Sequence, residues 1–354
     1  SVKTKQYRDV PLHPLIIELG FSEYFEGLGE KKFRIQQVHE WLWQKHAHSF
    51  DDMTNLSKEL RAKLNETFIL PALTIDKTQV SEDGTVKSRF KTFDKHFIEG
   101  VLIPTEERKT ACVSSQIGCS LSCKFCATGT MDRKRNLTYD EIYDQVVYIL
   151  QQSEATYEKH LSNIVFMGMG EPLMNYHNVL KAIEKITSPD GLGMSAKRIT
   201  VSTAGLIKQI RQLGDDNVKF KLAISLHAAN DKKRNEIMPI NESNNIKGLV
   251  EAINYFYKKT GTEVTFEYIL FKDFNDSEKD AEELTKIYRQ VPADLINIIE
   301  YNPVDIFPFD KPDEEGFERF VEILQKNRVN VRVRHSRGKD IDAACGQLAN
   351  KDNF

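Results

Sequence analysis

The sequence predicts an α/β fold, a partial (β/α)6 TIM-like barrel preceded by a small helical N-terminal domain. The first observation behind this prediction is that, from residue 110 onward, short apolar runs of strand length alternate with longer segments of helical character. The second is that residues 1 to about 75 show helical periodicity without such alternation. A chain of 354 residues is long enough for about two domains.

Two N-terminal segments place apolar residues at helical spacing: IQQVHEWLW (Ile35, Val38, Leu42) and LSKELRAKL (Leu56, Leu60, Leu64). The polar segment LPALTIDKTQVSEDG that follows predicts a linker, and TVKSRFKTF and HFIEGVLIP predict a hairpin joined near Asp94 and Lys95. We therefore expect four parts: a helical accessory domain (1–75), a linker with a hairpin extension (76–104), the barrel (105–345) and a C-terminal tail (346–354).

The barrel prediction names its elements in order. The expected strands are TACVS, SNIVFM, RITVS, KFKLAISL, EVTFEYILF, LINIIEY and VNVRVRH. The expected helices include LTYDEIYDQVVYILQQ, NVLKAIEKI, IKGLVEAINYFYKK, SEKDAEELTKIYRQ and EGFERFVEILQKN. Strands joined by helical crossovers run parallel, and in a barrel the chemistry lies at their C-terminal ends.

Composition argues against a membrane protein. No apolar run approaches the roughly 20 residues of a membrane span, and the N-terminal segment SVKTKQYRDV lacks the apolar stretch of a secretory signal. We therefore expect a cytoplasmic protein. The net charge of −3 gives no general bias toward nucleic acid, but basic residues without intervening acids lie between Lys326 and Lys339, which makes this segment a candidate RNA contact.

Four of the five cysteines lie in the segment CVSSQIGCSLSCKFC, and three of them form a C-x3-C-x2-C motif: Cys119, Cys123 and Cys126. Three closely spaced thiolates on one loop are typical of a [4Fe–4S] cluster with one iron left open to a ligand. A structural zinc site is the alternative, but it requires four ligands, commonly in two separated pairs, and the second pair is missing here.

Several polar residues and glycines follow the predicted strands. GMGEP comes after NIVF, Ser202 after RITV, the run Ser225-Leu226-His227 after KLAI, and Asn302 after IIEY. Gly168 and Gly170 permit close approach of a ligand to the backbone. A buried core histidine remains an alternative interpretation of His227.

The cysteine motif, with Phe125 before its last cysteine, resembles that of the radical S-adenosylmethionine (SAM) superfamily. The resemblance covers about residues 90 to 350 and implies the partial barrel of that superfamily. It further implies that the open iron chelates the amino and carboxylate groups of SAM. Reductive cleavage of that cofactor then yields a 5′-deoxyadenosyl radical.

Further motifs resemble the RlmN/Cfr family of RNA methyltransferases: CVSSQIGC, FMGMGEP, SLHA, MPIN, YNP and DIDAACGQL occur in the family's order. The resemblance implies methylation of C2 of adenosine 2503 in the peptidyl-transferase centre of 23S rRNA, and of adenosine 37 in tRNA, with two SAM molecules per turnover. It also implies the cofactor contacts Gly170, Glu171, Ser202, Ser225, Leu226, His227 and Asn302.

The same resemblance assigns three catalytic residues. Adenine C2 is too electron-poor to attack a sulfonium methyl group, so one SAM methylates Cys345 and the radical from a second removes hydrogen from that S-methyl group. The carbon radical adds to C2, Glu99 accepts the C2 proton, and Cys112 attacks the Cys345 sulfur, which releases the methylated base through a disulfide.

Two alternatives remain open. A Cfr-like enzyme would methylate C8 of the same rRNA adenosine with the same five cysteines, and a zinc-stabilised RNA-binding protein would have no catalysis. The resemblance further implies a flavodoxin-type electron donor. We expect a monomer with no membrane partner, and RNA binding by the N-terminal domain and the basic segment 326–339.

Overall fold

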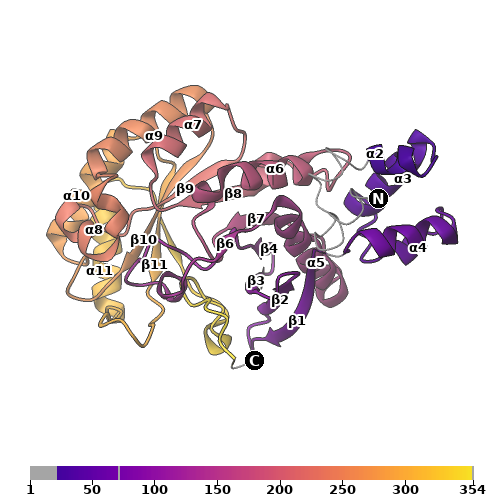
Figure 1. Cartoon of the computed structure of the whole chain (residues 1–354). Coiled ribbons are helices and arrows are strands. Elements are labelled where there is room, and N and C mark those ends of the chain that lie inside the picture. The colour runs from indigo at the N-terminus through magenta and orange to yellow at the C-terminus, as the bar shows by residue number, and fades with distance from the viewer. Residues whose placement is uncertain (1–21, 71, 353–354) are drawn as a thin grey trace.

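The computed structural model describes residues 22–70 and 72–352. Its main feature is a sheet of ten strands in the order β1-β2-β3-β4-β7-β8-β9-β10-β11-β12, with helices around the outside and a small helical domain at one end (Figure 1). The first 21 residues, which the sequence analysis included in the helical domain, lie outside the described residues.

The N-terminal domain contains α2 (Ser22–Gly27), α3 (Lys32–Trp43) and α4 (Lys58–Thr67). Ser57 caps α4 by accepting a hydrogen bond from the Leu60 amide at 3.1 Å. The domain has its own apolar core, which confirms the predicted helical periodicity: Phe25, Val38, Phe50, Met53, Leu56, Leu60, Leu64 and Phe68. Trp43 instead joins the main core, where the Tyr143 hydroxyl donates to its carbonyl at 2.6 Å.

An antiparallel extension follows, made of β1 (Leu73–Val80), β2 (Val86–Thr92) and β3 (Phe97–Pro104). The predicted hairpin is confirmed as β2–β3, but the predicted linker is wrong because most of it forms β1. This strand lies at the sheet edge and most of its residues are exposed. Its polar composition therefore reflects solvent on one side and not the absence of structure.

The predicted partial barrel is confirmed. Consecutive parallel strands lie side by side: β4 (Lys109–Cys112), β7 (Asn163–Phe166), β8 (Ile199–Thr203), β9 (Lys221–Ser225), β10 (Val264–Leu270), β11 (Leu295–Glu300) and β12 (Val331–Arg334). Strand β4 also pairs antiparallel with β3, so the extension continues the barrel sheet directly. A separate pair, β5 (Gln116–Ile117) and β6 (Arg135–Asn136), flanks the cysteine loop.

Helices connect these strands: α5 (Tyr139–Tyr157), α6 (Tyr176–Thr187), α7 (Ile207–Asp215), α8 (Asp231–Ile237), α9 (Ile246–Thr260), α10 (Glu278–Gln290) and α11 (Glu314–Lys326). Helices α7 and α8 are the ones the sequence analysis did not name. Buried apolar residues on the helices and strands form one large core between them. The C-terminal ends of the parallel strands all lie on the same side of the barrel, where the loops that lead to the next helices converge (Figure 1).

The segment after β12 returns across the open side of the barrel to the antiparallel extension. The Gly338 amide donates to Asp83 at 2.8 Å, and the Lys87 ammonium donates to the Ile341 carbonyl at 2.6 Å. The C-terminal end of the ribbon therefore lies beside β1 and β2 (Figure 1). We call residues 335–352 the C-terminal segment.

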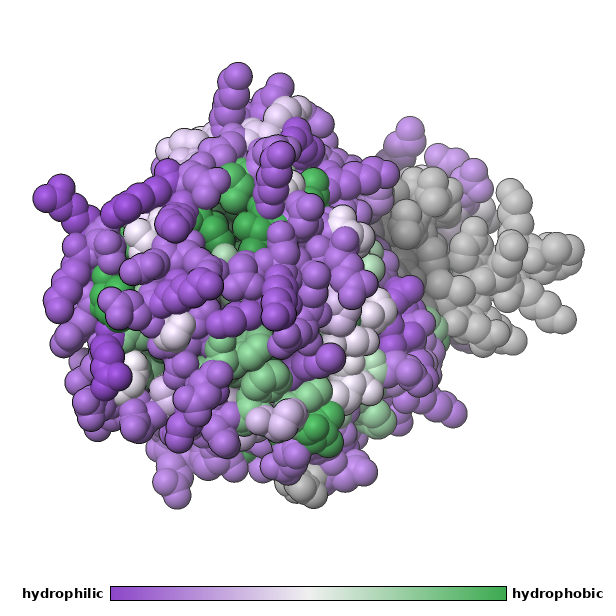
Figure 2. Space-filling view, turned by 90° about the vertical axis from the view of Figure 1, so that its left-hand side faces the viewer, coloured by the Kyte–Doolittle hydropathy of each residue, from purple (hydrophilic) through white to green (hydrophobic). Residues whose placement is uncertain are grey.

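The outer face formed by the later helices is covered mainly by hydrophilic residues, with small separate apolar areas between them (Figure 2). Among the described residues, none of the helices has the length and apolar character needed to cross a membrane.

Leu64→Ala should loosen the N-terminal domain selectively. Leu64 is fully buried in the separate core, so its truncation should lower the stability of that domain by about 2–5 kcal/mol. Of the two tryptophans of the chain, Trp41 packs against this core and Trp43 against the main core, so urea unfolding is followed by the fluorescence of Trp41 in a Trp43→Phe background. The matched control, Lys63→Ala on the exposed face of α4, should leave the midpoint unchanged. An equal shift of the far-ultraviolet circular dichroism transition would contradict a separate core.

Candidate active site

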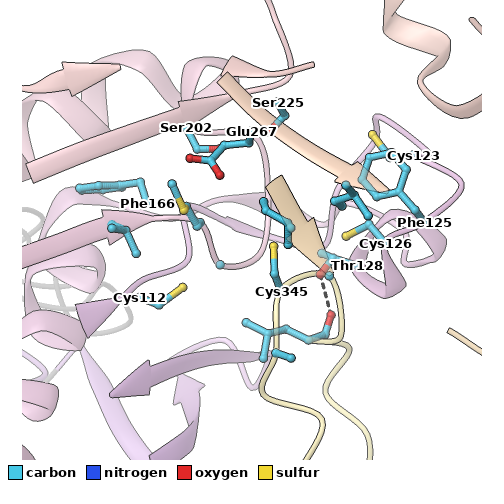
Figure 3. A pocket seen from close by; sticks show the side chains of 18 of the residues that line it. Cys112, Cys123, Phe125, Cys126, Thr128, Phe166, Ser202, Ser225, Glu267 and Cys345 are labelled. Atoms are coloured by element: carbon cyan, nitrogen blue, oxygen red, sulfur yellow. Dashed lines mark hydrogen bonds between the residues drawn. The ribbon is translucent and has the colours of Figure 1, made fainter. Parts of the chain in front are cut away.

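A cavity of about 320 Å³ lies at the C-terminal ends of the barrel strands, and all five cysteines line it. Most of the residues that the sequence analysis selected also line it: Gly170, Glu171, Ser202, Ser225 and His227. Figure 3 shows Cys123 and Cys126 on the loop at one side, Cys112 at the other, and Cys345 rising from the C-terminal segment between Cys112 and Cys126. Glu99, Leu226 and Asn302 are not among the lining residues.

The loop that carries Cys119, Cys123 and Cys126 is anchored through its backbone. The Lys124 amide donates to the Ile237 carbonyl at 2.9 Å, and the Ala127 amide donates to the Gly346 carbonyl at 2.7 Å. A Cβ at Gly129 would lie 3.0 Å from the Cys123 carbonyl oxygen, a tight contact, so glycine favours the close packing of this turn against the loop. The loop therefore holds its three thiols against both the barrel and the C-terminal segment.

The three thiols suit a cofactor that holds them as thiolates. Burial raises the pKa of Cys119 to about 11 and that of Cys123 well above its usual value, so a cationic centre is needed to keep them ionised. Within residues 22–70 and 72–352, no three His, Cys, Asp or Glu side chains are arranged to bind one metal ion directly. In an iron–sulfur cluster each thiolate binds a different iron, so such convergence is not required.

The GMGEP turn packs tightly against β5. Gly170 has a φ of +94°, and a Cβ there would lie 2.5 Å from the Gln116 Cβ. The Glu171 carboxylate accepts hydrogen bonds from the amides of Leu173 at 3.0 Å and Ala204 at 2.8 Å. Burial nevertheless raises the pKa of Glu171 to about 7. Glu171 thus joins the loops that follow β7 and β8 while it lines the cavity.

His227 combines the two interpretations that the sequence left open. Its Nδ1 accepts a hydrogen bond from the Ile269 amide at 3.1 Å, so the neutral ring carries its proton on Nε2. Burial lowers the pKa of His227 to about 3, and the ring packs edge-on against Phe125 at 4.8 Å. His227 is therefore a buried histidine with a hydrogen-bonded Nδ1, and it also forms part of the cavity wall.

Leu226 and Asn302 do not line the cavity, but each makes hydrogen bonds that hold neighbouring parts of the site in place. Leu226 is fully buried, its amide donates to the Glu267 carbonyl at 3.0 Å, and its carbonyl accepts from Arg234 Nε at 3.0 Å. Asn302 Nδ2 donates to the Cys345 carbonyl at 3.2 Å. In this structure Asn302 therefore positions the segment that carries Cys345.

Cys112 and Cys345 face the same cavity although 233 positions separate them in the chain. Cys112 ends β4 and is buried, whereas Cys345 is open to the cavity. Burial, and to a smaller extent the Cys345 thiol, raises the pKa of Cys112 to about 12. The surrounding walls raise the pKa of Cys345 to about 11, while Arg334 lowers it and Cys126 raises it. Cys345 is therefore electrostatically coupled to Cys112 and to the cysteine loop.

Arg334 and Glu267 are cavity residues that the sequence analysis did not select as a pair. Arg334 Nη1 donates to Glu267 Oε2 at 2.9 Å, and Asn297 Nδ2 donates to Glu267 Oε1 at 2.9 Å. Arg334 acts on both Cys112 and Cys345, and its charge favours their thiolates. The only signal in the sequence was its place in the basic segment 326–339, where His335 and Arg337 also line the cavity.

Glu99 lies beneath the C-terminal segment. Its Oε2 accepts hydrogen bonds from the amides of Ala349 at 3.1 Å and Asn350 at 3.2 Å, and its Oε1 lies 3.6 Å from the Lys87 ammonium. Burial raises the pKa of this carboxyl group, and Lys87 opposes that shift. The proposed proton acceptor is thus separated from the cavity in this arrangement, and its assigned role stays a prediction.

Comparison with known proteins places the chain among radical SAM methyltransferases. Residues 18–70 match the ribosomal RNA large subunit methyltransferase N-terminal domain, and residues 113–285 match the radical SAM superfamily. The probable dual-specificity RNA methyltransferase RlmN of Cytophaga hutchinsonii is 56% identical, over 94% of this chain and 90% of that protein. Its counterpart in Christiangramia forsetii is 55% identical, over 93% of this chain and 94% of that protein.

A solved structure is also similar over nearly its whole length. The radical SAM methyltransferase from Sphaerobacter thermophilus is 40% identical, with a TM-score of 0.88 over 93% of this chain and 96% of that one. The family predicted from the motifs is therefore confirmed, as is the radical SAM type of barrel.

Gly170→Ala should destabilise the protein more than Gly193→Ala. Both glycines have a positive φ, but a Cβ at Gly193 meets no atom within 4 Å, whereas a Cβ at Gly170 collides with Gln116. The strained backbone alone costs about 1 kcal/mol, and the collision adds to it at Gly170 only. Chemical unfolding of the two variants measures the difference. Equal losses of stability would show that the turn yields without cost.

Proposed function

This chain belongs to the RlmN family of dual-specificity RNA methyltransferases within the radical SAM superfamily, and we propose that it methylates C2 of adenosine 2503 in 23S rRNA and of adenosine 37 in tRNA. As a member of this superfamily it uses a [4Fe–4S] cluster and SAM. The observation that carries the proposal is that Cys112 and Cys345 line one cavity together with the three cysteines of the C-x3-C-x2-C loop.

We assign the cluster to Cys119, Cys123 and Cys126, because these thiols share one loop at the cavity wall. Residues at the ends of β7, β8, β9 and β11 are proposed to hold SAM beside it: Gly170, Glu171, Ser202, Ser225, Leu226, His227 and Asn302. The cluster, when bound, supplies the electron for the reductive cleavage of SAM. Apolar walls such as Phe125 and Phe166 keep water away from the reacting groups.

Cys345 is the proposed methyl carrier. Its thiol is open to the cavity, and Arg334, held by Glu267, favours the thiolate that must attack the first methyl group. Its place between Cys126 and Cys112 suits both later stages: hydrogen removal from the S-methyl group near the cluster, and attack by the Cys112 sulfur at the end. That attack breaks the bond between the Cys345 sulfur and the methylene carbon, which takes up a proton to become the methyl group of the base, and it leaves a disulfide between the two cysteines.

Glu99 is the proposed acceptor of the C2 proton. The carboxylate can reach a substrate base only after the amides of Ala349 and Asn350 leave it. The proposed chemistry therefore includes a movement of the C-terminal segment when RNA enters. We favour methylation at C2 over methylation at C8 because the relatives named above carry the RlmN name.

For substrate binding we retain the N-terminal domain and the basic segment 326–339 as proposed RNA contacts. The target base must leave its stack to reach a cavity of this kind. A flavodoxin-type donor, a monomeric state and a cytoplasmic location complete the proposal.

Cys112→Ala should stall the reaction after the carbon–carbon bond forms. Without the resolving thiolate, RNA stays covalently attached to Cys345, and the adduct should migrate as a protein–RNA species in denaturing gels. The matched control is Cys345→Ala, which should form no adduct because it has no sulfur to methylate. If Cys112→Ala turns over normally, or if no adduct accumulates, the resolving role is wrong.

Iron and acid-labile sulfide analysis of anaerobically purified protein tests the cofactor. For one cluster we expect about four irons and four sulfides per chain, and a brown protein that absorbs visible light. A colourless protein that contains zinc would instead support the non-catalytic alternative. Mass spectrometry of digested, methylated RNA then separates C2 from C8 methylation. Methyl transfer by the Cys345→Ser enzyme would disprove the proposed mechanism.

A further inference from the structure

A second pocket lies outside the active-site cavity, beside the turn between β2 and β3. Its volume is about 250 Å³, close to the smaller end of small-ligand pockets. Its walls come from four chain segments: Lys95, His96, Phe97, Ile117, Met131, Asp132, Lys134 and Asn350. We call it the hairpin pocket. The function proposed above assigns no role to it.

The segments that build the hairpin pocket are those that carry the proposed catalytic residues. Phe97 and Glu99 lie on the same face of β3, two residues apart. Ile117 precedes the first cluster cysteine by two positions. Asn350 connects the hairpin pocket to Glu99, because its amide donates to Glu99 and its side-chain Nδ2 donates to the Phe97 carbonyl at 2.7 Å. The pocket therefore adjoins the segment that covers Glu99.

The charge of the hairpin pocket is positive because two lysines, Lys95 and Lys134, and a single acid, Asp132, are among its lining residues. Asp94, at the hairpin turn, is bound by Arg135 through two hydrogen bonds of 2.8 Å. Asp132 is the acid on the pocket wall, and it pairs with Lys134 only at 4.0 Å while 93% of its side chain is exposed. Lys95 makes no ion pair with any acid of the described chain. Two ammonium groups are thus available to an anion.

The pocket also offers apolar surface. Phe97 lines it, and the Arg89 guanidinium lies 4.7 Å from the ring centroid, which fixes the ring orientation. Met131, whose side chain is flexible, and Ile117, whose side chain is branched and stiff, complete this surface. Cationic groups beside an aromatic ring are the combination that single-stranded RNA needs, because phosphates bind ammonium groups and bases stack on rings.

We propose that the hairpin pocket binds a nucleotide that flanks the methylated adenosine of the RNA substrate. Lys95 and Lys134 each bind one of the two phosphates that flank this nucleotide, and Phe97 and Met131 contact its base or ribose. This inference rests on the proposed RNA methyltransferase function and adds a binding site to it. Occupation of the pocket would bring RNA against Asn350, next to the contact that keeps Glu99 covered.

The test compares RNA binding by wild-type protein and the Lys95→Ala/Lys134→Ala variant. The probe is a labelled anticodon stem-loop with adenosine beside the anticodon, and fluorescence anisotropy is measured over a series of KCl concentrations. Loss of two phosphate contacts should raise Kd about tenfold at moderate salt. The slope of log K against log salt should fall by about 1.4, since each contact to single-stranded RNA contributes about 0.7.

The matched control is Lys258→Ala/Lys259→Ala, which removes two exposed lysines at the end of α9, next to the start of β10 and therefore at the N-terminal ends of the barrel strands, away from the active-site cavity. This variant should bind RNA as the wild type does. Equal affinities and salt slopes for the two double variants would overturn the proposal. The proposal would also be overturned if the Lys95→Ala/Lys134→Ala variant bound RNA normally but was no longer reduced by a flavodoxin-type donor. The pocket would then be a binding site for an acidic protein.

Ethylation interference on the same RNA provides a second measurement. Blocked phosphates next to the target adenosine should weaken binding to the wild type and have no further effect on the pocket variant. Thermal unfolding and iron content show that the variants are folded. Absence of RNA methylation by the wild-type protein would contradict the proposed function itself, whereas normal methylation with unaltered interference would contradict only the pocket.

Discussion

The hydrogen bonds made by the backbone of the C-terminal segment hold Cys345 in the active-site cavity. The Gly346 carbonyl accepts from Ala127, the Leu348 carbonyl accepts from the Thr128 hydroxyl at 2.6 Å, and the amides of Ala349 and Asn350 bind Glu99. A parallel barrel that stops short of closure leaves one side open. Here the returning segment covers that side, and Cys345 enters the cavity as a consequence.

This arrangement has an electrostatic consequence. Burial favours neutral thiols, whereas methyl transfer and cluster binding both require thiolates. Arg334 opposes the effect of burial at Cys112 and Cys345, and the carboxylate of Glu267 keeps its guanidinium in place. A buried ion pair is a weak source of stability, so the place of Arg334 in the wall of the cavity that holds both cysteines is better understood as support for their ionisation, which Glu267 opposes in part at Cys345.

Much of the fold could be predicted from the sequence because its signals are local. The parallel strands are short apolar runs, and the cysteine motif needs only its spacing. Strand β1 was missed because an edge strand with an exposed face has linker-like composition, and α8 because seven residues give little periodicity. The ion pair between Arg334 and Glu267, the cover over Glu99 and the hairpin pocket join residues far apart in the chain, so no local pattern could reveal them.

Within the C-terminal segment, the contacts that fix the backbone near Cys345 use main-chain atoms of the segment, and their partners include the side chains of Thr128 and Glu99. Main-chain groups are common to all residues, so a replacement at the partly exposed Ala349 leaves the bond of its amide to Glu99 intact. Gly346, with a φ of +81° and little space for a Cβ, is the exception. A position such as Ala349 can therefore change while the reactive sulfur keeps its place, which leaves room to adjust substrate fit around a constant chemical centre.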